Sequence, residues 1–548
     1  MNGADTFTAA LRAHDVEWVS TLCGHGLNEV YAACERTGLR IVDTRNEQTA
    51  SYMAECWGRL SGKVGVCAVS SGVAHANALS GIANAYFDGA PMLLVTGSGP
   101  LSTAGKGHFQ DFDQVALVQS VCKYARTIDV AERIPEIVHE AMATAVSGRP
   151  GPVHLTFPTD MQEQMVADST PPSPQPDKAR PILPSDDAVR QAARLLARSE
   201  RPLMITGSGV FYASAGKAVA DFAAAYAVPF AIPIWDRGCV AQPLPEYLGV
   251  VGAASGGPRL LEDADLILLL GAAADYRVSY MQAPAIDVQT QVIRVDVDPD
   301  RLHHMGRATL SVLADPAMFL QRLIDVCAKE QIEGFEDWLH ETQRRKEEFS
   351  AAIRTSGHGG LDALQLCAAL DEALPEDAVV VIDGGNIGQW VHQTLGRARY
   401  PESWLTCGAS GVVGYGIAGA MAARAGFPQR PVVVISGDGS ATFNLTDLER
   451  AVRQQLPFVM IVADDEAWGI TVSGHRQHYG KAMSSELGPV DFAAAAEAFG
   501  AIGARVESCE ELIPAVRRGV AESRPVVIHV RIPGGMPGEQ GAHSEALT

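Results

Sequence analysis

Residues 435–470 read ISGDGSATFNLTDLERAVRQQLPFVMIVADDEAWGI, and this stretch contains the strongest structural signal in the sequence. A short apolar run ends in Gly437-Asp438-Gly439-Ser440, and a second apolar run, Phe458–Val462, is followed by Asp464-Asp465. A helical pattern separates the two runs, so we predict a strand, a helix and a second strand parallel to the first. Such sheets bind ligands beyond the carboxyl ends of their strands, and both acidic ends are expected at that edge.

This predicted edge has the chemistry of a phosphate and metal site. Gly437 and Gly439 let the backbone approach a phosphate closely, and the helix that starts near Ser440 offers free N–H groups. Asp438 and Asp465 supply the hard oxygen ligands that octahedral Mg²⁺ takes together with phosphate oxygens. The same residues also fit a glycine turn followed by ordinary acidic loop ends, so the pattern alone leaves both interpretations open.

Outside this stretch, short apolar runs alternate with amphipathic helical stretches along all 548 residues. Examples of the apolar runs are PMLLVTGSG (91–99), ADLILLLGA (264–272) and AVVVIDGGN (378–386). Continuous runs of this kind between helices indicate parallel strands that are buried on both faces. We therefore expect three α/β domains, each a doubly wound parallel sheet with right-handed crossovers.

The predicted domain boundaries follow changes in composition. The stretch 166–184 contains six Pro and little periodicity, which is typical of a linker. We predict domains at 1–165, 185–350 and 358–533, and a short polar tail at 534–548.

The composition argues against several classes of partner. The chain has 43 basic and 64 acidic residues and a formal charge of −21. Nucleic-acid and anionic-membrane binders need basic clusters, so neither partner is expected. No apolar stretch reaches the ~18 residues of a spanning helix, and the first residues lack the apolar core of a signal peptide. Ten scattered Cys without a CxxC pair fit a cytoplasmic protein.

The stretch 437–465 resembles the diphosphate-binding motif of thiamine diphosphate (ThDP) enzymes, in which GDG is followed by a pair of Asn. Other segments are similar to this family in the same order, namely TRNE (44–47), FDGAPMLLVTGSGP (87–100), GRPGPVHLTFPTD (148–160) and LTCGASGVVGYG (405–416). Along nearly its whole length the chain resembles the acetolactate synthase-like branch. Locally, IVDTRNEQTA (41–50) and EAWGITV (466–472) are most similar to benzaldehyde lyase and cyclohexane-1,2-dione hydrolase.

The resemblance implies three domains of similar topology: an aminopyrimidine-binding, a middle and a diphosphate-binding domain. It implies ThDP and Mg²⁺ as cofactors, bound between the first domain of one subunit and the third domain of another. A homodimer is then the minimal active unit, and a homotetramer is expected. FAD, which some relatives hold in the middle domain, is not expected, because GAAADYRVS (271–279) matches that region only partly, although Arg277 remains. The middle domain is then expected to be a scaffold.

For catalysis, the resemblance implies that Glu47 contacts N1′ of the aminopyrimidine and helps to remove the proton from thiazolium C2, giving an ylide. Gln110 matches a glutamine that points to the reaction centre. His25 and His75 replace a Pro and a small residue of many relatives, and both are candidate acid/base groups near neutral pH. A structural role is the alternative for each histidine. The residues expected to line the substrate pocket are Gly26, His108, Phe109, Trp468 and Thr471.

For cofactor binding, the resemblance implies contacts from the ends of three strands and from a glycine-rich segment before the GDG motif. Val413 replaces a larger residue, often Met, that bends the cofactor in many relatives. Asp438 and Asp465 are the implied side-chain ligands of Mg²⁺, and Ala467 contributes a carbonyl oxygen. The expected cofactor contacts are Gly385, Asn386, Gly411, Val413, Gly437, Asp438, Gly439, Ser440 and Ile470.

One departure from the family concerns charge. Asp464-Asp465 stands where relatives have two Asn, and the extra carboxylate adds negative charge beside a diphosphate. We therefore predict that Mg²⁺ and ThDP depend strongly on each other for binding. The departure also leaves open a non-catalytic binding protein with the same fold.

The expected activity is that of a lyase or carboligase acting on a small carbonyl substrate. It would cleave or form a C–C bond next to the carbonyl of a 2-hydroxy ketone or 2-oxo acid, through the ylide and an enamine. The first alternative is condensation of pyruvate, as in acetolactate synthase. The second is a 2-hydroxyacyl-CoA lyase or an oxalyl-CoA decarboxylase, which would need a nucleotide site that no basic cluster suggests.

Overall fold

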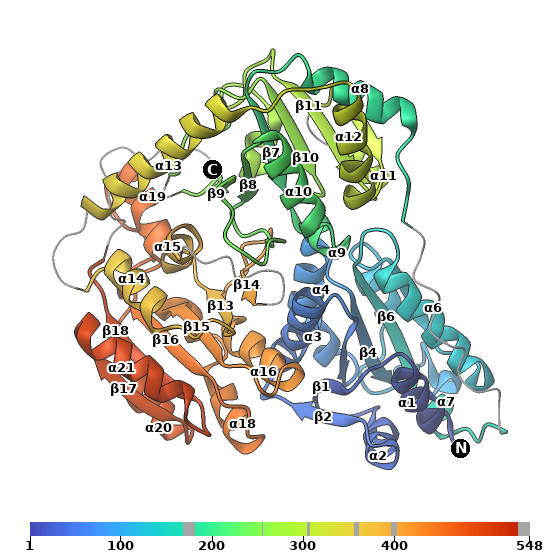
Figure 1. Cartoon of the computed structure of the whole chain (residues 1–548). Coiled ribbons are helices and arrows are strands. Elements are labelled where there is room, and N and C mark those ends of the chain that lie inside the picture. Colours follow the sequence, from blue (N-terminus) through green and yellow to red (C-terminus); the bar gives the residue numbers. More distant parts are fainter. Residues whose placement is uncertain (168–180, 255, 304–306, 356–360, 396–402, 535–548) are drawn as a thin grey trace.

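The computed structural model describes residues 1–167, 181–254, 256–303, 307–355, 361–395 and 403–534. These residues form three six-stranded sheets that follow one another along the chain (Figure 1). Every strand pairing is parallel, which confirms the predicted α/β class. Most of the expected linker, 168–180, and nearly all of the expected tail, 535–548, lie outside the described residues.

The first sheet consists of β1 (Trp18–Leu22), β2 (Arg40–Asp43), β3 (Gly65–Val69), β4 (Met92–Ser98), β5 (Tyr124–Thr127) and β6 (Pro152–Pro158). Its helices are α1 (Gly3–Ala13), α2 (Asn28–Thr37), α3 (Glu47–Ser61), α4 (Val73–Asp88), α5 (Gln114–Val118), α6 (Ile134–Val146) and α7 (Thr159–Glu163). The strand order is β2-β1-β3-β4-β6-β5. Strands β3 and β6 are buried along their whole length, as their continuous apolar character predicts.

The middle sheet consists of β7 (Pro202–Thr206), β8 (Phe230–Pro233), β9 (Tyr247–Val251), β10 (Leu266–Leu270), β11 (Gln291–Asp296) and β12 (Leu310–Leu313). Its helices are α8 (Asp186–Leu196), α9 (Ser208–Tyr212), α10 (Gly216–Tyr226), α11 (Pro299–His303), α12 (Pro316–Lys329) and α13 (Glu336–Thr355). The strand order, β12-β11-β10-β7-β8-β9, is that of a dinucleotide-binding doubly wound sheet.

The third sheet consists of β13 (Val379–Asp383), β14 (Trp404–Leu405), β15 (Val432–Gly437), β16 (Val459–Asp464), β17 (Ile502–Val506) and β18 (Val526–Arg531). Its helices are α14 (Ala363–Ala373), α15 (Asn386–Thr394), α16 (Gly416–Gly426), α17 (Asp438–Ala441), α18 (Leu448–Arg453), α19 (Gly469–Tyr479), α20 (Phe492–Ala498) and α21 (Cys509–Val520). The order β14-β13-β15-β16-β18-β17 repeats that of the first sheet. The expected similarity of topology therefore holds for the two outer domains but not for the middle one.

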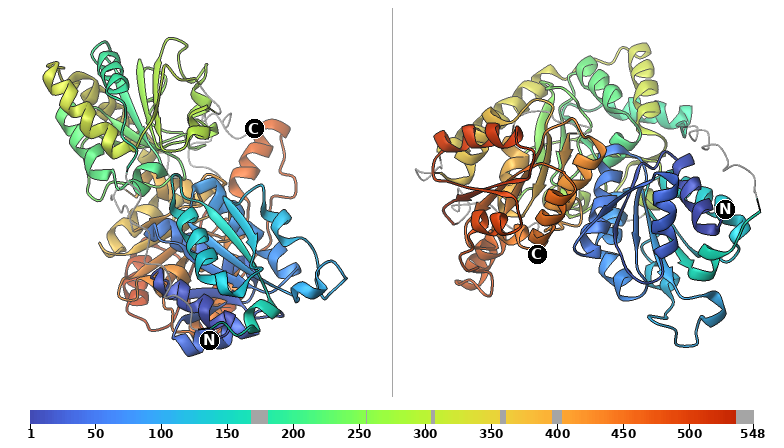
Figure 2. Two further views of the ribbon diagram at one scale, coloured as in Figure 1. Left: turned by 90° about the vertical axis from the view of Figure 1, so that its right-hand side faces the viewer. Right: turned by 90° about the horizontal axis from the view of Figure 1, so that it is seen from below.

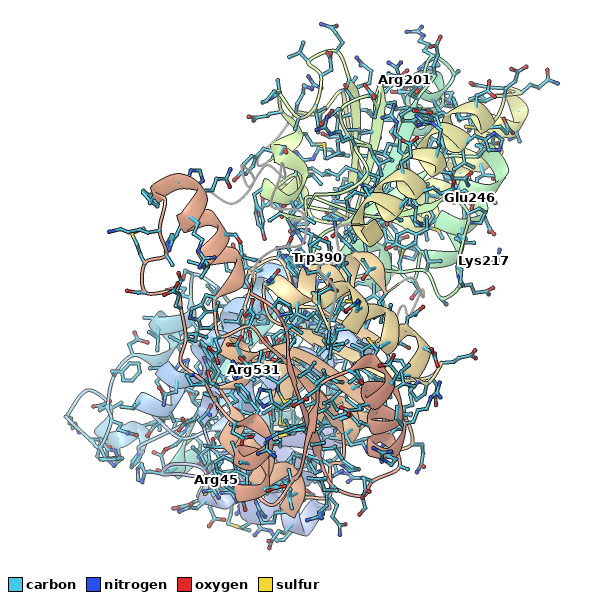
Figure 3. The ribbon with its side chains drawn as sticks, turned by 90° about the vertical axis from the view of Figure 1, so that its left-hand side faces the viewer. Arg45, Arg201, Lys217, Glu246, Trp390 and Arg531 are labelled. Atoms are coloured by element: carbon cyan, nitrogen blue, oxygen red, sulfur yellow. The ribbon has the colours of Figure 1, made fainter. Side chains whose placement is uncertain are left out.

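One hydrophobic cluster contains residues of all three domains, while the first and middle domains also have cores of their own. Helix α3 packs against α16, so the first and third domains lie side by side (Figure 2). A Cβ atom on Gly426 would lie only 2.0 Å from the Trp57 ring, so the glycine is needed for this close approach. This hydrophobic cluster includes Ile234 of the middle domain and Trp390 on α15. The side chain of Trp390 is fully buried (Figure 3). Among the described residues, no helix combines the length and apolar character needed to cross a membrane.

Candidate active site

The strongest candidate site lies at the carboxyl edge of the third sheet. Strand β13 runs into Gly384-Gly385-Asn386, β15 into the GDGS turn, and β16 into Asp464-Asp465. Asp383 is the register partner of Ser436, and Gly437 is the partner of Ala463, so the three strand ends are level with one another. This confirms the edge predicted from the sequence. The edge includes the switch point at which the order reverses between β13 and β15.

Glycine allows the three strand ends to touch. Gly384 has φ +129°, and a Cβ atom there would lie 2.8 Å from the backbone N of Gly437. A Cβ atom on Gly385 would lie 3.0 Å from Cδ1 of Ile470, and one on Gly439 would lie 2.8 Å from the Trp468 ring. The cofactor contacts expected on β13, on α17 and at the start of α19 therefore belong to one cluster.

Among the described residues, no Lys, Arg or His side chain forms an ion pair with Asp438 or Asp465. Burial, with a further contribution from Asp465, raises the pKa of Asp438 to about 7. Burial also raises the pKa of Asp465, while the Asn386 amide, whose Nδ2 lies 3.4 Å from Asp465 Oδ2, lowers it. The Oδ1 atom of Asn386 is buried without a hydrogen-bond partner. Carboxylates of raised pKa and an unpaired amide oxygen are what a site that takes a divalent cation should present without it.

The protein by itself does not complete a metal cage here. Among the described residues, no group of three or more His, Cys, Asp or Glu side chains is arranged to hold a metal ion. Asp438 and Asp465 bring two carboxylates to this edge, and Ala467 lies in the same turn as Asp465, paired with Glu486 by a β-bridge. Mg²⁺ commonly takes one or two carboxylates and completes its shell with phosphate oxygens and water, so the donor set fits Mg²⁺ bound together with a diphosphate.

Asp464 is buried more deeply than its neighbour Asp465 and has a hydrogen-bond partner of its own. Its side chain is 1% exposed, and Oδ2 lies 2.8 Å from Nε2 of His529 on β18. Its Oδ1 accepts the N–H of Glu466 at 3.1 Å. The extra carboxylate expected beside the diphosphate therefore has a partner, which the sequence did not reveal because His529 lies 65 residues further along the chain.

The segment 411–414, expected to face the aminopyrimidine, is held by two side chains that sequence reasoning missed. Asp383 accepts the N–H of Gly414 at 2.9 Å and that of Gly416 at 2.8 Å, and burial raises its pKa to about 6. Asn444 donates to the carbonyl of Gly414 at 2.6 Å. Val413 is half-buried and Gly411 is exposed, so both are accessible to a cofactor. Asp383 directly precedes the GGN sequence at 384–386, and this position was the signal in the sequence that could have indicated a role for it at the site.

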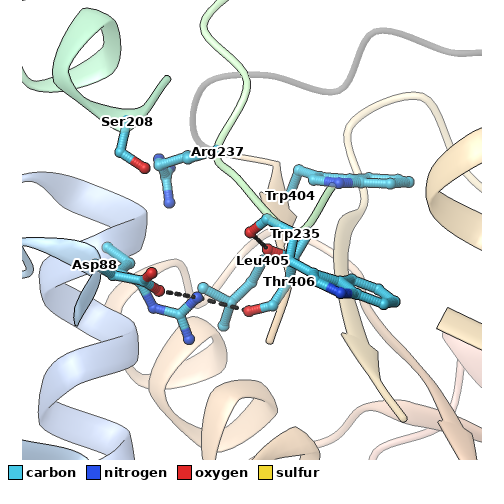
Figure 4. A pocket seen from close by; sticks show the side chains of 8 residues that line it. Asp88, Ser208, Trp235, Arg237, Trp404, Leu405 and Thr406 are labelled. Atoms are coloured by element: carbon cyan, nitrogen blue, oxygen red, sulfur yellow. Dashed lines mark hydrogen bonds and ion pairs between the residues drawn. The ribbon is translucent and has the colours of Figure 1, made fainter. Parts of the chain in front are cut away.

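The residues that lead into this segment are clamped by the other two domains (Figure 4). Arg59 on α3 donates to the carbonyl of Thr406 at 2.6 Å and pairs with Asp88 at 3.2 Å. Asp88 in turn accepts the N–H of Ala409 at 2.8 Å, and Thr406 donates its hydroxyl to the carbonyl of Trp235 in the middle domain. A void of about 10 Å³ remains between these residues, which is room for one water molecule and not for a substrate.

Glu47 is the first residue of α3. Asn46 caps this helix, because its Oδ1 accepts the N–H of Thr49 at 2.8 Å. The same two residues bind the third domain: Asn46 donates to Asn444, and Thr49 donates to Asp447. Glu47 itself is half-buried and accepts from Nδ2 of the exposed Asn77 at 3.0 Å. The fold therefore fixes the helix start rigidly while the Glu47 carboxylate stays accessible.

The loops after β1 and β4 bring several expected pocket residues together. The ring of His25 lies 5.7 Å from that of His108 and 5.3 Å from that of Phe109, measured between centroids. Gly26 has φ +94°, and its carbonyl accepts from Gln162. Gln110 is held by the Ser71 hydroxyl, which donates to its Oε1 at 3.0 Å. A cavity of about 430 Å³ opens here, and its lining includes His108, Gln110, Phe112, Gln114 and Thr156.

His75 is not among the residues that line this cavity, but its ring stacks on that of the lining residue Phe112 with 6.4 Å between centroids. It is fully buried, and its ring stacks on that of His154 with 4.6 Å between centroids. Burial lowers the pKa of His75 to about 4, so the imidazole is neutral at pH 7. The acid/base role expected for His75 stays a prediction, and a neutral imidazole would have to act as the base.

The remaining pocket candidates lie on the third domain. Trp468 is half-buried, with its ring edge-on to Phe443 at 6.3 Å, and Thr471 is exposed on α19. Among the described residues, no hydrogen bond, ion pair or ring contact joins Trp468 or Thr471 to the His25 loop, so within one chain the candidate pocket residues form two separate groups.

Comparisons with known proteins identify all three domains. Residues 1–117 match the thiamine pyrophosphate enzyme N-terminal TPP binding domain, residues 189–323 the central domain, and residues 383–530 the C-terminal TPP binding domain. The chain is 29% identical to the acetolactate synthase isozyme 2 large subunit of Escherichia coli, over 97% of this chain and 96% of that protein. It is 26% identical to a probable acetolactate synthase large subunit of Methanococcus aeolicus, over 97% and 92%.

A differently named relative is equally similar. The chain is 28% identical to 2-hydroxyacyl-CoA lyase 2 of Homo sapiens, over 97% of this chain and 90% of that protein. Because the three domain matches occur in order and the relatives align over almost the whole chain, this protein belongs to the thiamine pyrophosphate enzymes and is a member of the acetolactate synthase-like family.

Proposed function

We propose that this enzyme uses ThDP and Mg²⁺ to cleave or form the C–C bond next to the carbonyl group of a small 2-hydroxy ketone or 2-oxo acid. The observation that carries the proposal is the cluster of Asp438, Asp465 and Asn386 at the glycine-lined ends of three adjacent strands. When bound, ThDP supplies a nucleophilic carbon at thiazolium C2 and an electron sink for the carbanion that C–C cleavage leaves.

The residues of the third domain would hold the cofactor. Asp438 and Asp465, with the carbonyl of Ala467, are the proposed ligands of Mg²⁺, and the backbone of Gly437–Ser440 and of Gly385 lies where a diphosphate would fit. Since the described residues provide no third acidic or imidazole ligand, the metal would need oxygens of the diphosphate to fill its shell. This supports the expected mutual dependence of Mg²⁺ and ThDP.

Glu47 is the proposed proton carrier. At the fixed start of α3 its carboxylate would share a proton with N1′ of the aminopyrimidine, which is the atom that the family resemblance places there. Val413, on the segment tied down by Asp383, would support the pyrimidine ring from the other side. Gln110 would donate a hydrogen bond to the substrate carbonyl, and His25 and His75 are the proposed acid/base groups.

The proposed catalytic unit is a homodimer, and we extend this to a homotetramer. Within one chain Glu47 accepts from Asn77 on α4, one turn after Val73, which is 62% exposed. Gly72, which precedes Val73, lies against Gln110 in the loop that exposes Phe109 (61%) and Phe112 (44%). Exposed apolar side chains around a candidate catalytic carboxylate are what a surface covered by a second copy should show. A second copy would supply the third-domain half of the pocket, with Trp468 and Thr471.

The lining of the 430 Å³ cavity favours a small substrate over an acyl-CoA. It contains His108, Gln110 and Phe112 but no Lys or Arg among the described residues, whereas a nucleotide phosphate would need a cation. Condensation of pyruvate is the second candidate, supported by relatives named acetolactate synthase. FAD is not part of the proposal, because Arg277 is already paired with Asp275 at 2.8 Å and Asp236 at 3.5 Å.

We place the enzyme in the cytoplasm. All ten cysteines are free, and most are buried, which fits a reducing compartment.

The test is an assay of purified protein with ThDP and Mg²⁺, offered pyruvate, benzoylformate, benzoin and a cyclic 1,2-diketone in parallel. Turnover of at least one substrate is expected, together with loss of most activity in Glu47→Gln and retention of ThDP binding by that variant. Gln48→Glu, one residue further along α3, is a matched control that should keep activity. Equal activity of wild type and Glu47→Gln would contradict the assigned role.

A further inference from the structure

The turn that contains the proposed metal ligands Asp465 and Ala467 is fastened to the neighbouring strand β18. The carbonyl of Asp464 accepts the N–H of Ile532 at 3.0 Å. The side chain of Glu466 pairs with Arg531, and that of Asp464 pairs with His529. Glu466 has φ +52°, a left-handed conformation that a non-glycine residue adopts only when its surroundings fix it. The turn is therefore held in one shape by two contacts with β18 and one with Ile532, the residue that follows this strand.

The two side-chain contacts differ in their environment. Asp464 and His529 are 1% and 8% exposed, whereas Glu466 and Arg531 are 34% and 60% exposed. A carboxylate can only accept, so Nε2 of His529 must donate the hydrogen bond, which spans 2.8 Å. An exposed ion pair contributes little, but a buried carboxylate that loses its donor is strongly destabilised.

The negative charge of the neighbouring carboxylates makes the contact between Asp464 and His529 more important. The negative charge of Asp464 interacts with those of Asp438 and Asp465. Among the described residues, no Lys or Arg forms an ion pair with any of these three carboxylates. Within the part of the chain that the structure describes, His529 is the basic side chain that pairs with this acidic group. Without it, Asp464 would turn out of its buried position, and the 464–467 turn would follow.

We propose that His529 is a positioning residue: by holding Asp464 against β18, it keeps Asp465 and the Ala467 carbonyl aimed at the Mg²⁺–diphosphate. The inference rests on the proposed function of this edge. The chemistry requires only a donor at His529 when position 464 carries a carboxylate. An amide at position 464 would still accept the Glu466 N–H bond without carrying a charge, so it would remove the need for the donor.

This predicts a rescue that simple loss of packing would not give. The variants are His529→Leu, which removes the donor but fills the space, and His529→Gln, which keeps an N–H in a similar place. Asp464→Asn is then added to His529→Leu. ThDP binding is titrated by tryptophan fluorescence quenching at varied Mg²⁺, with circular dichroism as the check on folding, so the readout does not depend on turnover.

We expect His529→Leu to weaken Mg²⁺-dependent ThDP binding by about tenfold or more, the usual effect of removing a partner outside the ligand shell. His529→Gln and Asp464→Asn should each stay within about threefold of wild type, and Asp464→Asn should restore most of the affinity to His529→Leu. Arg531→Ala, on the same strand but in an exposed pair, is the matched control and should bind like wild type.

Three results would overturn the inference. One is unchanged affinity in His529→Leu, and another is a double variant that binds no better than His529→Leu or is less well folded. The third is wild-type protein that binds no ThDP even at high Mg²⁺, which would overturn the proposed function as well. If His529→Leu does not fold, the double variant decides: recovery of folding and of binding supports the inference, and failure of both overturns it.

Discussion

Replacing Arg59 with Met should destabilise the protein severely, because Arg59 is the cation of a buried junction between the three domains. Its side chain is 4% exposed and pairs with Glu55, which is 0% exposed, at 2.7 Å and with Asp88, 8% exposed, at 3.2 Å. It also donates to the Thr406 carbonyl at 2.6 Å. Met has a similar length and fills much of the space, but it leaves two buried carboxylates without a cation.

Removing one partner of a buried ion pair costs about 3–5 kcal/mol, and we expect a loss of unfolding free energy in this range. A protein of this size does not unfold in one step, so the quantity to compare is the first urea transition, followed by circular dichroism. Arg133→Met is the control, since Arg133 pairs with Glu136 at the surface, and the transition should hardly move. Adding Glu55→Gln to Arg59→Met should recover part of the loss, because it removes one unpaired charge.

A loss below about 1 kcal/mol in Arg59→Met would refute the reasoning. It would mean that Glu55 and Asp88 can be hydrated or protonated in the variant with little loss of unfolding free energy. A further reduction of stability on adding Glu55→Gln would refute it in another way, by showing that size and not charge decides. ThDP affinity should also fall in Arg59→Met, because Arg59 holds the segment that leads to Gly411.

Three further substitutions test other parts of the structure. Gly384→Ala should cost about 1–3 kcal/mol and weaken ThDP binding, measured by urea unfolding and by titration, because φ is +129° and the new Cβ atom would lie 2.8 Å from Gly437 N. Asp465→Ala should lower Mg²⁺ affinity by about 100-fold in equilibrium dialysis with ThDP present, and an unchanged affinity would remove Asp465 from the ligand set. Burial lowers the pKa of His392 to about 3, so below pH 6.5 the unfolded chain binds a proton that the native protein does not, and stability falls by up to about 1.4 kcal/mol per pH unit. His392→Asn, which still accepts the Trp235 N–H, should make the dependence of unfolding free energy on pH between 6 and 4 less steep, and an unchanged slope would contradict this assignment.

Local sequence was enough to place the strands and the acidic edge. Runs such as VVVID at Val379–Asp383 are buried on both faces, and this alone specifies a parallel strand between helices. Local sequence was not enough to predict the order of the strands in the middle sheet, where β10 pairs with β7 and β11. Strand order depends on which helix covers which face, and that is decided by packing between segments far apart in the chain.

The candidate site shows the same division. Gly437, Asp438 and Asp465 are contributed by short local motifs, so their meeting at one edge follows from parallel strands. His529 and Arg59 have no motif around them, and their partners lie 65 residues away in Asp464 and 347 residues away in Thr406. A buried basic residue in an apolar segment was the available signal, but sequence alone cannot say which of many acidic residues it will meet.

The middle domain also contacts the loop that leads to the segment 411–414. The hydroxyl of Thr406 donates to the carbonyl of Trp235, and the hydroxyl of Tyr276 donates to the carbonyl of Ala409 at 3.1 Å. Both contacts lie just before the segment 411–414, whose other end is tied down by Asp383 and Asn444. A change in the packing of Trp235 or Tyr276 would shift the near end of that segment while its far end stays fixed, so substitutions in the middle domain should act on cofactor binding without touching the cofactor.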